Sequence, residues 1–180
     1  MKIIAGRLRG RKIKAPKGLV TRPVLARVRE ALFNILGNVE ELRVLDLYAG
    51  TGAIGIEALS RNAKSVVFVE LGSVQCRIIQ ENLDLFEEDA VIMHTDVMRA
   101  LKKLEKDGMV FDFVFADPPY KKELSQKTVS TVCESGLLSD SGMMAITIHH
   151  HQELPDMSGK CEKVIDRRYG NTRLALYKVK

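Results

Sequence analysis

Cysteine is scarce in this sequence, with three residues in 180. Cys76, Cys133 and Cys161 form no C-x-x-C pair, which excludes the common zinc and thioredoxin-like arrangements. Their odd number argues against a disulfide framework. We therefore expect reduced, mostly buried thiols in a cytoplasmic protein.

Long apolar runs are also missing. No stretch approaches the roughly 18 apolar residues that a membrane helix needs. The N-terminus, MKIIAGRLRGRK, has no apolar core and no later cleavage signal, so we expect no secretory signal. The first 30 residues contain no serine, in which transit peptides are rich. The composition, 46% hydrophobic and 28% charged, is typical of a globular protein, and the length suits about one domain.

Negative charge is nearly absent from the first 30 residues, which hold ten Lys or Arg and a single acid, Glu30. The remaining 150 residues hold 18 basic and 22 acidic residues. A basic segment on a slightly acidic body is typical of binding to a phosphate backbone. We expect RNA contacts from seven residues: Arg7, Arg9, Arg11, Lys12, Lys14, Arg22 and Arg27. The alternative is a solvated basic surface.

The periodicity of the chain changes near residue 40. Residues 2–15 predict short strands or a hairpin, and a helix is expected from residues 21–23 to Gly37, with Arg22, Arg27 and Arg29 on its surface. Beyond it, strands (44–47, 65–70, 90–94, 111–116, 143–148) alternate with helices (54–61, 74–86, 97–104, 121–133), and a hairpin (162–168, 172–179) follows. This order predicts an α/β domain with a parallel sheet and helices on both faces. We assign residues 1–39 to a basic extension and 40–180 to the α/β domain.

A glycine-rich loop, DLYAGTGAIG from Asp46, follows the first α/β strand and opens a helix. Its G-x-G-x-x-G spacing permits a tight turn and close backbone approach to a ligand. Glu70, at the end of the next strand, suits both hydroxyls of a ribose. Asp46 suits a cationic amino group better than a pyrophosphate, which favours S-adenosylmethionine over a dinucleotide. A loop that only lets the helix pack on the strand is the structural alternative.

Asp96 follows the third strand of the α/β part. Its carboxylate is suited to cap the next helix, and also to accept a hydrogen bond from the exocyclic amine of an adenine. The candidate cofactor-binding residues are Asp46, Tyr48, Ala49, Gly50, Thr51, Gly52, Glu70, Leu71, Asp96 and Val97.

The tetrad Asp117-Pro118-Pro119-Tyr120 ends the strand over 111–116. Two prolines stiffen the turn, which then presents a carboxylate, a backbone carbonyl and an aromatic ring. Two acceptors would orient an exocyclic amine of a nucleobase for methyl transfer, and the ring of Tyr120 would stack on the base. We predict that the four residues form the catalytic site. The alternative is a strand-ending turn with a buried tyrosine.

Four segments together resemble one family. They are IIAGRLRGRKIKAP with the following TRP and RVREALFNIL, the loop DLYAGTGAIGIEAL, the DPPY tetrad, and the closing RRYGNTRLALYK. The chain resembles the RsmD-type bacterial 16S rRNA guanine-N2 methyltransferases over nearly its whole length. The resemblance implies a class I methyltransferase fold with seven strands, the last antiparallel, and S-adenosylmethionine as cofactor. It also implies that Asp117, Pro118 and Tyr120 hold the amine of a guanine in 16S rRNA, within an assembling small subunit.

Three segments depart from the family pattern. Val24-Leu25-Ala26 replaces polar residues at a helix start, Leu71 replaces a charged residue, and residues 147–151 replace a stretch that contains an acid. The run His149-His150-His151 suggests a metal. In an extended strand, however, only His149 and His151 would share a face, so we expect a solvated strand end and no metal.

Three other functions compete with the main interpretation. A DNA adenine-N6 methyltransferase uses a similar tetrad, although it usually has a further target-recognition domain. An RNA-binding assembly factor would keep the fold without the chemistry. A NAD-dependent oxidoreductase would leave the tetrad and the basic arm unexplained. We expect a monomer.

Overall fold

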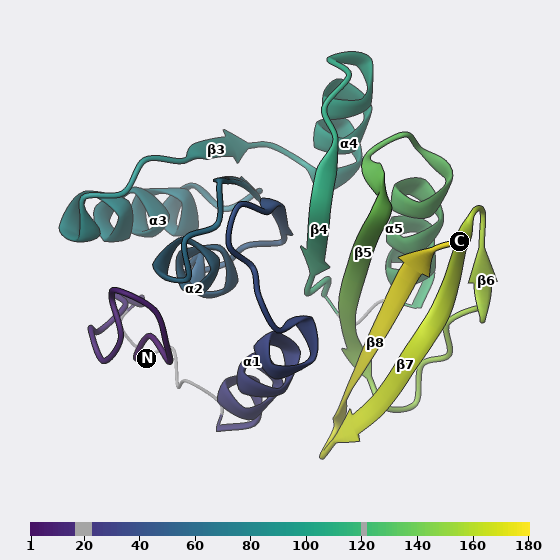
Figure 1. Ribbon diagram of the computed structural model, residues 1–180, viewed down its shortest axis with the longest axis horizontal. Coiled ribbons are helices and arrows are strands. Elements are labelled where there is room, and N and C mark those ends of the chain that lie inside the picture. The colour runs from purple at the N-terminus through teal and green to yellow at the C-terminus, as the bar shows by residue number, and fades with distance from the viewer. Residues whose placement is uncertain (17–22, 120–121) are drawn as a thin grey trace.

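The computed structural model describes residues 1–16, 23–119 and 122–180, where a mixed sheet is flanked by helices (Figure 1). Its strands are β1 Arg43–Leu47, β2 Ser65–Glu70, β3 Val91–His94, β4 Phe111–Ala116, β5 Leu138–His149, β6 Met157–Ser158, β7 Cys161–Tyr169 and β8 Thr172–Val179. The helices are α1 Pro23–Leu36, α2 Ala53–Ser60, α3 Ser73–Phe86, α4 Val97–Lys106 and α5 Lys122–Glu134. The helices and strands predicted from residue 23 onward are all present, most with ends within two residues of those expected, and β5 begins at Leu138 instead of residue 143.

The strands run in the order β3-β2-β1-β4-β5-β8-β7-β6. Strands β1 to β5 are parallel, and β8 pairs antiparallel with β5. The predicted count of seven strands is too low, because a two-residue strand, β6, pairs with the edge of β7. The chain order reverses between β1 and β4, so the carboxyl ends of these strands form the crevice where open α/β sheets bind ligands.

Two hydrophobic clusters cover the two faces of the sheet. Successive residues of β1 point to opposite faces, so Val44 packs with α1, α2 and α3 while Leu45 packs with α4 and α5. The cluster that contains Val44 also includes Ile3, Leu8 and Ile13 of the N-terminal arm, residues 1–16. No helix within the described ranges is both long and apolar enough to cross a membrane.

The N-terminal arm lies against α2 and is less regular than the predicted hairpin. Only one isolated antiparallel bridge, Lys2 to Lys12, occurs in its described part. Backbone hydrogen bonds from Ile3 to Arg11 (3.0 Å) and from Ile13 to Met1 (2.9 Å) flank this bridge, so a short hairpin is present. The arm is also held by the fully buried carboxylate of Glu57, which accepts hydrogen bonds from the backbone N–H groups of Ile4 (2.8 Å) and Ala5 (2.9 Å). A buried carboxylate with several donors is stable only in this fixed arrangement.

Arg29 of α1 does not lie on the surface as predicted, since only 4% of the residue is exposed. Its Nη2 donates to the carbonyl oxygen of Lys2 at 2.5 Å, and its Nε lies 4.0 Å from Oε2 of Glu57. Because the arm folds over the helix, an arginine that the helical pattern placed on a charged face is enclosed. Arg29 of α1, Glu57 of α2 and the backbone of the arm therefore form one buried cluster, which we call the charged cluster.

The close contact between arm and α2 yields a stability prediction. Gly6 has a φ of 81°, and a Cβ built there would lie 1.8 Å from the carbonyl oxygen of Ser60. Gly10 has nearly the same φ, 83°, but its Cβ would meet nothing within 4 Å. Gly10→Ala should cost about 1 kcal/mol for the left-handed conformation alone. Gly6→Ala should cost at least about 2 kcal/mol more, because the contact overpacks.

Urea unfolding of the wild type and of the two variants measures this difference. Gly10→Ala is the matched control, since it changes the same residue type in nearly the same backbone conformation. Equal losses of unfolding free energy in the two variants would show that the contact with Ser60 does not hold the arm.

Candidate functional site

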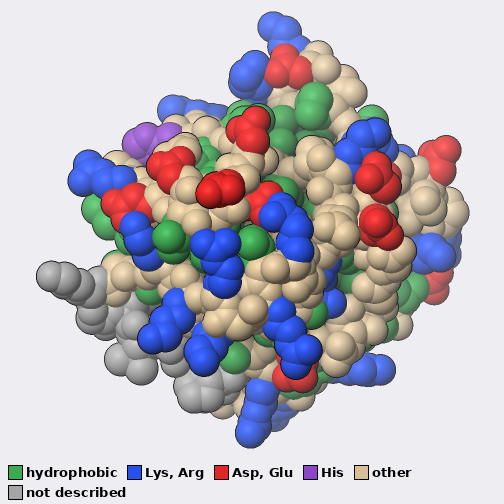
Figure 2. Space-filling view, turned by 60° about the vertical axis from the view of Figure 1, so that its left-hand side comes forward, with side chains coloured by type: hydrophobic (Ala, Val, Ile, Leu, Met, Phe, Trp, Pro, Cys, Tyr) green, Lys and Arg blue, Asp and Glu red, His purple; other side chains and the backbone are tan. Residues whose placement is uncertain are grey.

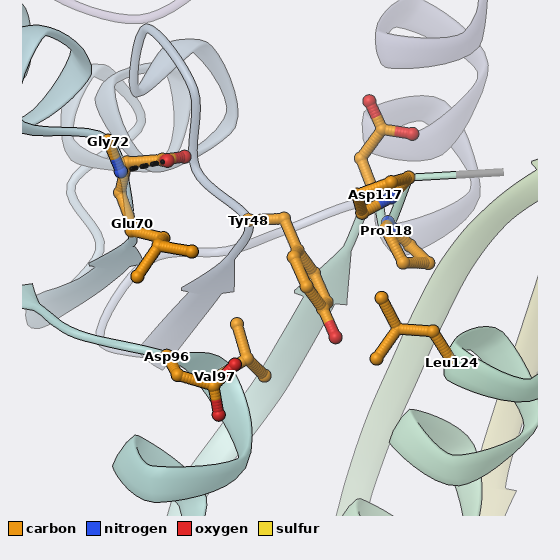
Figure 3. Close-up of a pocket in the computed structure, with 10 residues that line it drawn as sticks. Tyr48, Glu70, Gly72, Asp96, Val97, Asp117, Pro118 and Leu124 are labelled. Carbon is orange, nitrogen blue, oxygen red and sulfur yellow. Dashed lines mark hydrogen bonds between the residues drawn. The ribbon is translucent and has the colours of Figure 1, made fainter. Parts of the chain in front are cut away.

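A cavity of about 590 Å³ opens at the carboxyl ends of β1, β2 and β4, and Figure 3 shows the residues around it. We call it the edge cavity. Glu70 and Gly72 lie on one side of Tyr48, and Asp117, Pro118 and Leu124 lie on the other. Asp96 and Val97 contribute from the start of α4. The edge cavity thus collects the ends of several strands.

The glycine loop after β1 adopts a left-handed backbone at three positions. The φ angles are 57° at Tyr48, 58° at Gly50 and 74° at Gly52. Such angles are strained for most residues but cost glycine little, which explains the two glycines physically. The turn directs the N–H of Gly50 to Oε2 of Glu70 at 2.8 Å, while Gly72 donates to Oε1 at 2.8 Å. Glu70 therefore ties the loops after β1 and β2 together.

Asp46 is buried at the end of β1, where its Oδ2 accepts a hydrogen bond from the N–H of Gly55 at 3.0 Å. Burial raises the pKa of this carboxyl to about 8, opposed by the Gly55 hydrogen bond and assisted by the negative charges of Asp117 and Glu70. Asp46 is consequently mostly neutral at pH 7. A cation placed beside it would favour its ionised form.

Asp96 caps α4, as one of its two predicted roles requires. Its Oδ1 accepts from the N–H groups of Met98 (2.9 Å) and Arg99 (3.2 Å). The same side chain lines the edge cavity, together with Leu71, which is 67% exposed. The cap fixes the carboxylate of Asp96 at the cavity wall and does not conflict with the second role.

Asp117 is oriented by a residue of the neighbouring strand that the sequence did not single out for this purpose. Thr147, buried in β5, donates from Oγ1 to Oδ1 of Asp117. In the turn after β4, Pro118 is buried and Pro119 is exposed to solvent. Tyr120, the last member of the tetrad, lies outside the described residues. The predicted sheet order could have pointed to Thr147, because the carboxyl ends of the neighbouring parallel strands β4 and β5 lie at the same edge of the sheet.

A second cavity, of about 600 Å³, lies between the N-terminal arm, α1 and the glycine loop. We call it the arm cavity. Tyr48 and Asp117 line both cavities, and the hydroxyl of Tyr48 is 2.9 Å from Oγ1 of Thr128 in α5. Burial raises the pKa of this tyrosine, opposed by the hydrogen bond with Thr128. Tyr48 and Asp117 thus form the boundary where the two cavities meet.

The structure brings nearly all the predicted site residues to these cavities. The edge cavity is lined by Tyr48, Glu70, Leu71, Asp96, Val97, Asp117, Pro118 and Pro119. The arm cavity is lined by Asp46, Tyr48, Ala49, Gly50, Thr51 and Asp117. Gly52 lines neither and serves the turn. The sequence reasoning missed the positions of Thr147, Leu124 and Arg29 at these cavities. Arg29 belongs to the RVREALFNIL segment, but the helical pattern placed it on the surface.

The basic residues of the arm divide into two groups. All five predicted from Arg7 to Lys14 are exposed, as is Arg27 of α1, and Figure 2 shows Lys and Arg side chains spread over this side of the molecule. Arg7 pairs with Glu88, Arg11 donates to the carbonyl of Leu85 and stacks on Phe86, and Lys14 pairs with Glu81. Arg9 and Lys12 have no ion pair within the described residues. Arg22 lies outside them.

The three histidines after Ile148 do not alternate between faces as predicted. Strand β5 ends at His149 and the chain turns, so the three rings gather with ligand atoms within 4.8 Å of one another. The prediction that only His149 and His151 could share an ion is wrong, because it assumed that the strand continued. The cluster lies two residues beyond Thr147, near the same edge of the sheet.

The buried state of Asp46 gives a testable pH dependence. Its carboxyl is neutral in the folded protein up to about pH 8 but ionises near pH 4 when unfolded. The stability that it contributes is full below pH 4 and is lost as the pH rises to 8, by up to about 1.4 kcal/mol per pH unit. Relative to the wild type, Asp46→Asn should therefore gain stability from pH 5 to 8 in urea unfolding. Asp140→Asn, at an exposed position of β5, should run parallel to the wild type. A parallel course for Asp46→Asn as well would contradict the raised pKa.

Comparison with known proteins matches the chain to a family over almost its full length. The family model described as conserved hypothetical protein 95 matches residues 1–178. Ribosomal RNA small subunit methyltransferase D of Escherichia coli K12 is 31% identical over 179 residues, which cover 98% of this chain and 89% of that protein.

Solved structures agree with this match. YhhF from Escherichia coli has a TM-score of 0.88 and 30% identity, and the alignment covers 100% of this chain and 98% of YhhF. The 16S rRNA N2 methyltransferase RsmC of Thermus thermophilus, in complex with AdoMet and guanosine, has a TM-score of 0.76 at 21% identity over 100% of this chain and 49% of RsmC, which shows a shared fold. The chain therefore belongs to the conserved hypothetical protein 95 family, the RsmD-type methyltransferase family that its motifs predict.

Proposed function

We propose that this protein transfers a methyl group from S-adenosylmethionine to the N2 amine of a guanine in small-subunit 16S rRNA. The observation that carries the proposal is the position of Asp117, which lines both cavities at the point where the glycine loop and the DPPY turn meet. A relative that is 31% identical is named an rRNA small subunit methyltransferase, and RsmC, of the same fold, was solved with AdoMet and guanosine.

The residues of the edge cavity fit the adenosine part of S-adenosylmethionine. Glu70 offers carboxylate oxygens to the ribose hydroxyls, and Asp96 offers an acceptor to the adenine amine. Leu71, Val97 and Leu124 provide the apolar surface that a flat base requires, and the volume is within the range of small-molecule sites. Asp46, in the arm cavity, suits the α-ammonium group. When bound, the cofactor supplies an electrophilic methyl group on a sulfonium.

The chain itself has to orient a weak nucleophile. The lone pair of an exocyclic amine is delocalised into the base, and acceptors on its two N–H bonds turn that lone pair outward. The carboxylate of Asp117 is one such acceptor, held in place by the hydroxyl of Thr147. Its two oxygens together accept about four hydrogen bonds, so Thr147 does not use up its capacity. We assign the second acceptor to the backbone carbonyl that the DPPY turn presents, and base stacking to Tyr120.

The basic extension, residues 1–39, serves in this proposal as the RNA-binding part, and residues 40–180 as the methyltransferase domain. Phosphate contacts position a nucleic acid without reading its sequence. The choice of guanine then depends on the pocket at Asp117 and on RNA shape, and the base has to leave its stack. An assembling small subunit, in which the target is still accessible, is the substrate that we propose for a monomeric enzyme.

Methyl-transfer assays test the function directly. We expect labelled S-adenosylmethionine to yield N2-methylguanine in rRNA or immature small subunits, and no label in duplex DNA. Asp117→Ala should lower the rate at least about 100-fold, since it removes the acceptor for the amine. Asp140→Ala, which removes an exposed carboxylate of β5, is the matched control and should keep the rate. Label in N6-methyladenine would favour the DNA enzyme, and RNA binding without any transfer would favour the assembly factor.

The role of the arm is tested by charge reversal. The structure favours Arg9→Glu with Lys12→Glu, because these exposed residues take part in no ion pair within the described chain. The double variant should weaken RNA binding and lower the slope of log affinity against log salt by about 1.5, with unchanged cofactor affinity. The control, Lys102→Glu with Lys106→Glu, makes the same charge change on α4, on the other face of the sheet. If the two double variants weaken RNA binding equally, the arm contributes only through the net charge of the protein and is not a specific binding surface.

A further inference from the structure

Arg29 is a buried cation whose hydrogen-bonding capacity is largely unused. Only Nη2, which donates to the carbonyl of Lys2, has a hydrogen-bond partner in the described part of the chain; Nε and Nη1 have none. A guanidinium carries five N–H donors, and leaving them unsatisfied in a buried place is costly. A bound ligand that accepts hydrogen bonds from the guanidinium of Arg29 would remove this cost.

The charges around Arg29 do not balance within the protein. Glu57 is the carboxylate of the cluster, and it is already engaged by Arg61 at 3.0 Å and by the two backbone N–H groups of the arm. Arg29 lies further away, at 4.0 Å from Glu57. Burial lowers the pKa of Arg29, opposed by Glu57 and assisted by Arg61. Two guanidinium groups thus share one carboxylate, which leaves the cluster with an excess positive charge.

Arg29 lines the arm cavity, as do Asp46 and Asp117. We propose that Arg29 forms a binding site for an oxyanion, a carboxylate or a phosphate, that enters the arm cavity as part of the cofactor or of the target nucleotide. The proposal rests on the proposed function, since it assigns a residue to a substrate of that reaction. Planar guanidinium groups bind both kinds of oxyanion through paired hydrogen bonds.

The other charged groups of the cavity favour the carboxylate as the source. Asp117 and the exposed Glu30 of α1 repel a lone anion, whereas Lys2 attracts it, and Asp46 adds to the repulsion once it is ionised. A zwitterion avoids the conflict, because its ammonium group faces Asp46 while its carboxylate faces Arg29. The amino-acid end of S-adenosylmethionine has this charge pattern. A phosphate of the target nucleotide is the second source.

Calorimetric titration with truncated ligands separates the sources. S-adenosylhomocysteine and its decarboxylated analogue differ only in the carboxylate, and guanosine monophosphate and guanosine differ only in the phosphate. If the carboxylate is bound, the wild type should prefer S-adenosylhomocysteine by about 10- to 100-fold, as for a charged hydrogen bond. Arg29→Met should abolish this preference without lowering the affinity for the decarboxylated analogue. If the phosphate is bound, the same pattern should appear for the guanosine pair instead, measured in the presence of S-adenosylhomocysteine.

The comparison on the wild type keeps the test valid if Arg29→Met does not fold, and Arg29→Lys, which keeps the charge, should retain part of the preference. Equal affinities within both ligand pairs on the wild type would overturn the site, as would a preference that Arg29→Met leaves unchanged. Failure of the wild type to bind S-adenosylhomocysteine at all would instead reject the proposed function. The two failures are therefore distinguishable.

Discussion

The geometry of this protein depends on the buried carboxylate of Glu57. It accepts hydrogen bonds from the backbone of the N-terminal arm, pairs with Arg61 and lies near Arg29 of α1. Glu57 stands on α2, the helix that starts in the glycine loop, so the arm is fixed relative to that loop. Without it, the arm would lose two of the hydrogen bonds that hold its backbone against α2, and the wall that the arm contributes to the arm cavity would be less firmly fixed.

A second constraint is the concentration of carboxylates at one sheet edge. Asp46, Glu70 and Asp117 come from the ends of adjacent strands, and their mutual repulsion adds to burial in keeping Asp46 protonated. Hydrogen bonds limit the cost: Asp46 accepts one from Gly55, Glu70 accepts one each from Gly50 and Gly72, and Asp117 accepts one from Thr147. An edge with this electrostatic character favours a cationic ligand, and S-adenosylmethionine carries positive charge on its sulfonium and ammonium groups.

The basic arm combines structural and electrostatic roles. Arg7, Arg11 and Lys14 contact α3 and the loop after it, and they help to bind the arm to the body. Arg9 and Lys12 remain directed to solvent as an attractive surface for phosphates. The exposed ion pair of Lys14 with Glu81 contributes little to stability, so in the proposed RNA-binding role Lys14 can exchange this partner for a phosphate at small cost.

The sequence by itself determined the alternation of strands and helices, because hydrophobic periodicity and turn residues are local properties. It also located the glycine loop and the DPPY turn, whose chemistry is contained in contiguous residues. Only the tertiary structure decided that Arg29 is buried, that Thr147 orients Asp117 and that the three histidines gather. These contacts join residues separated by 28 to 30 positions or depend on where a strand ends, and no local pattern encodes them. The regularity of the arm's hairpin was overestimated for the same reason, since Glu57 and Ser60 of α2 satisfy backbone groups that a regular hairpin would have paired.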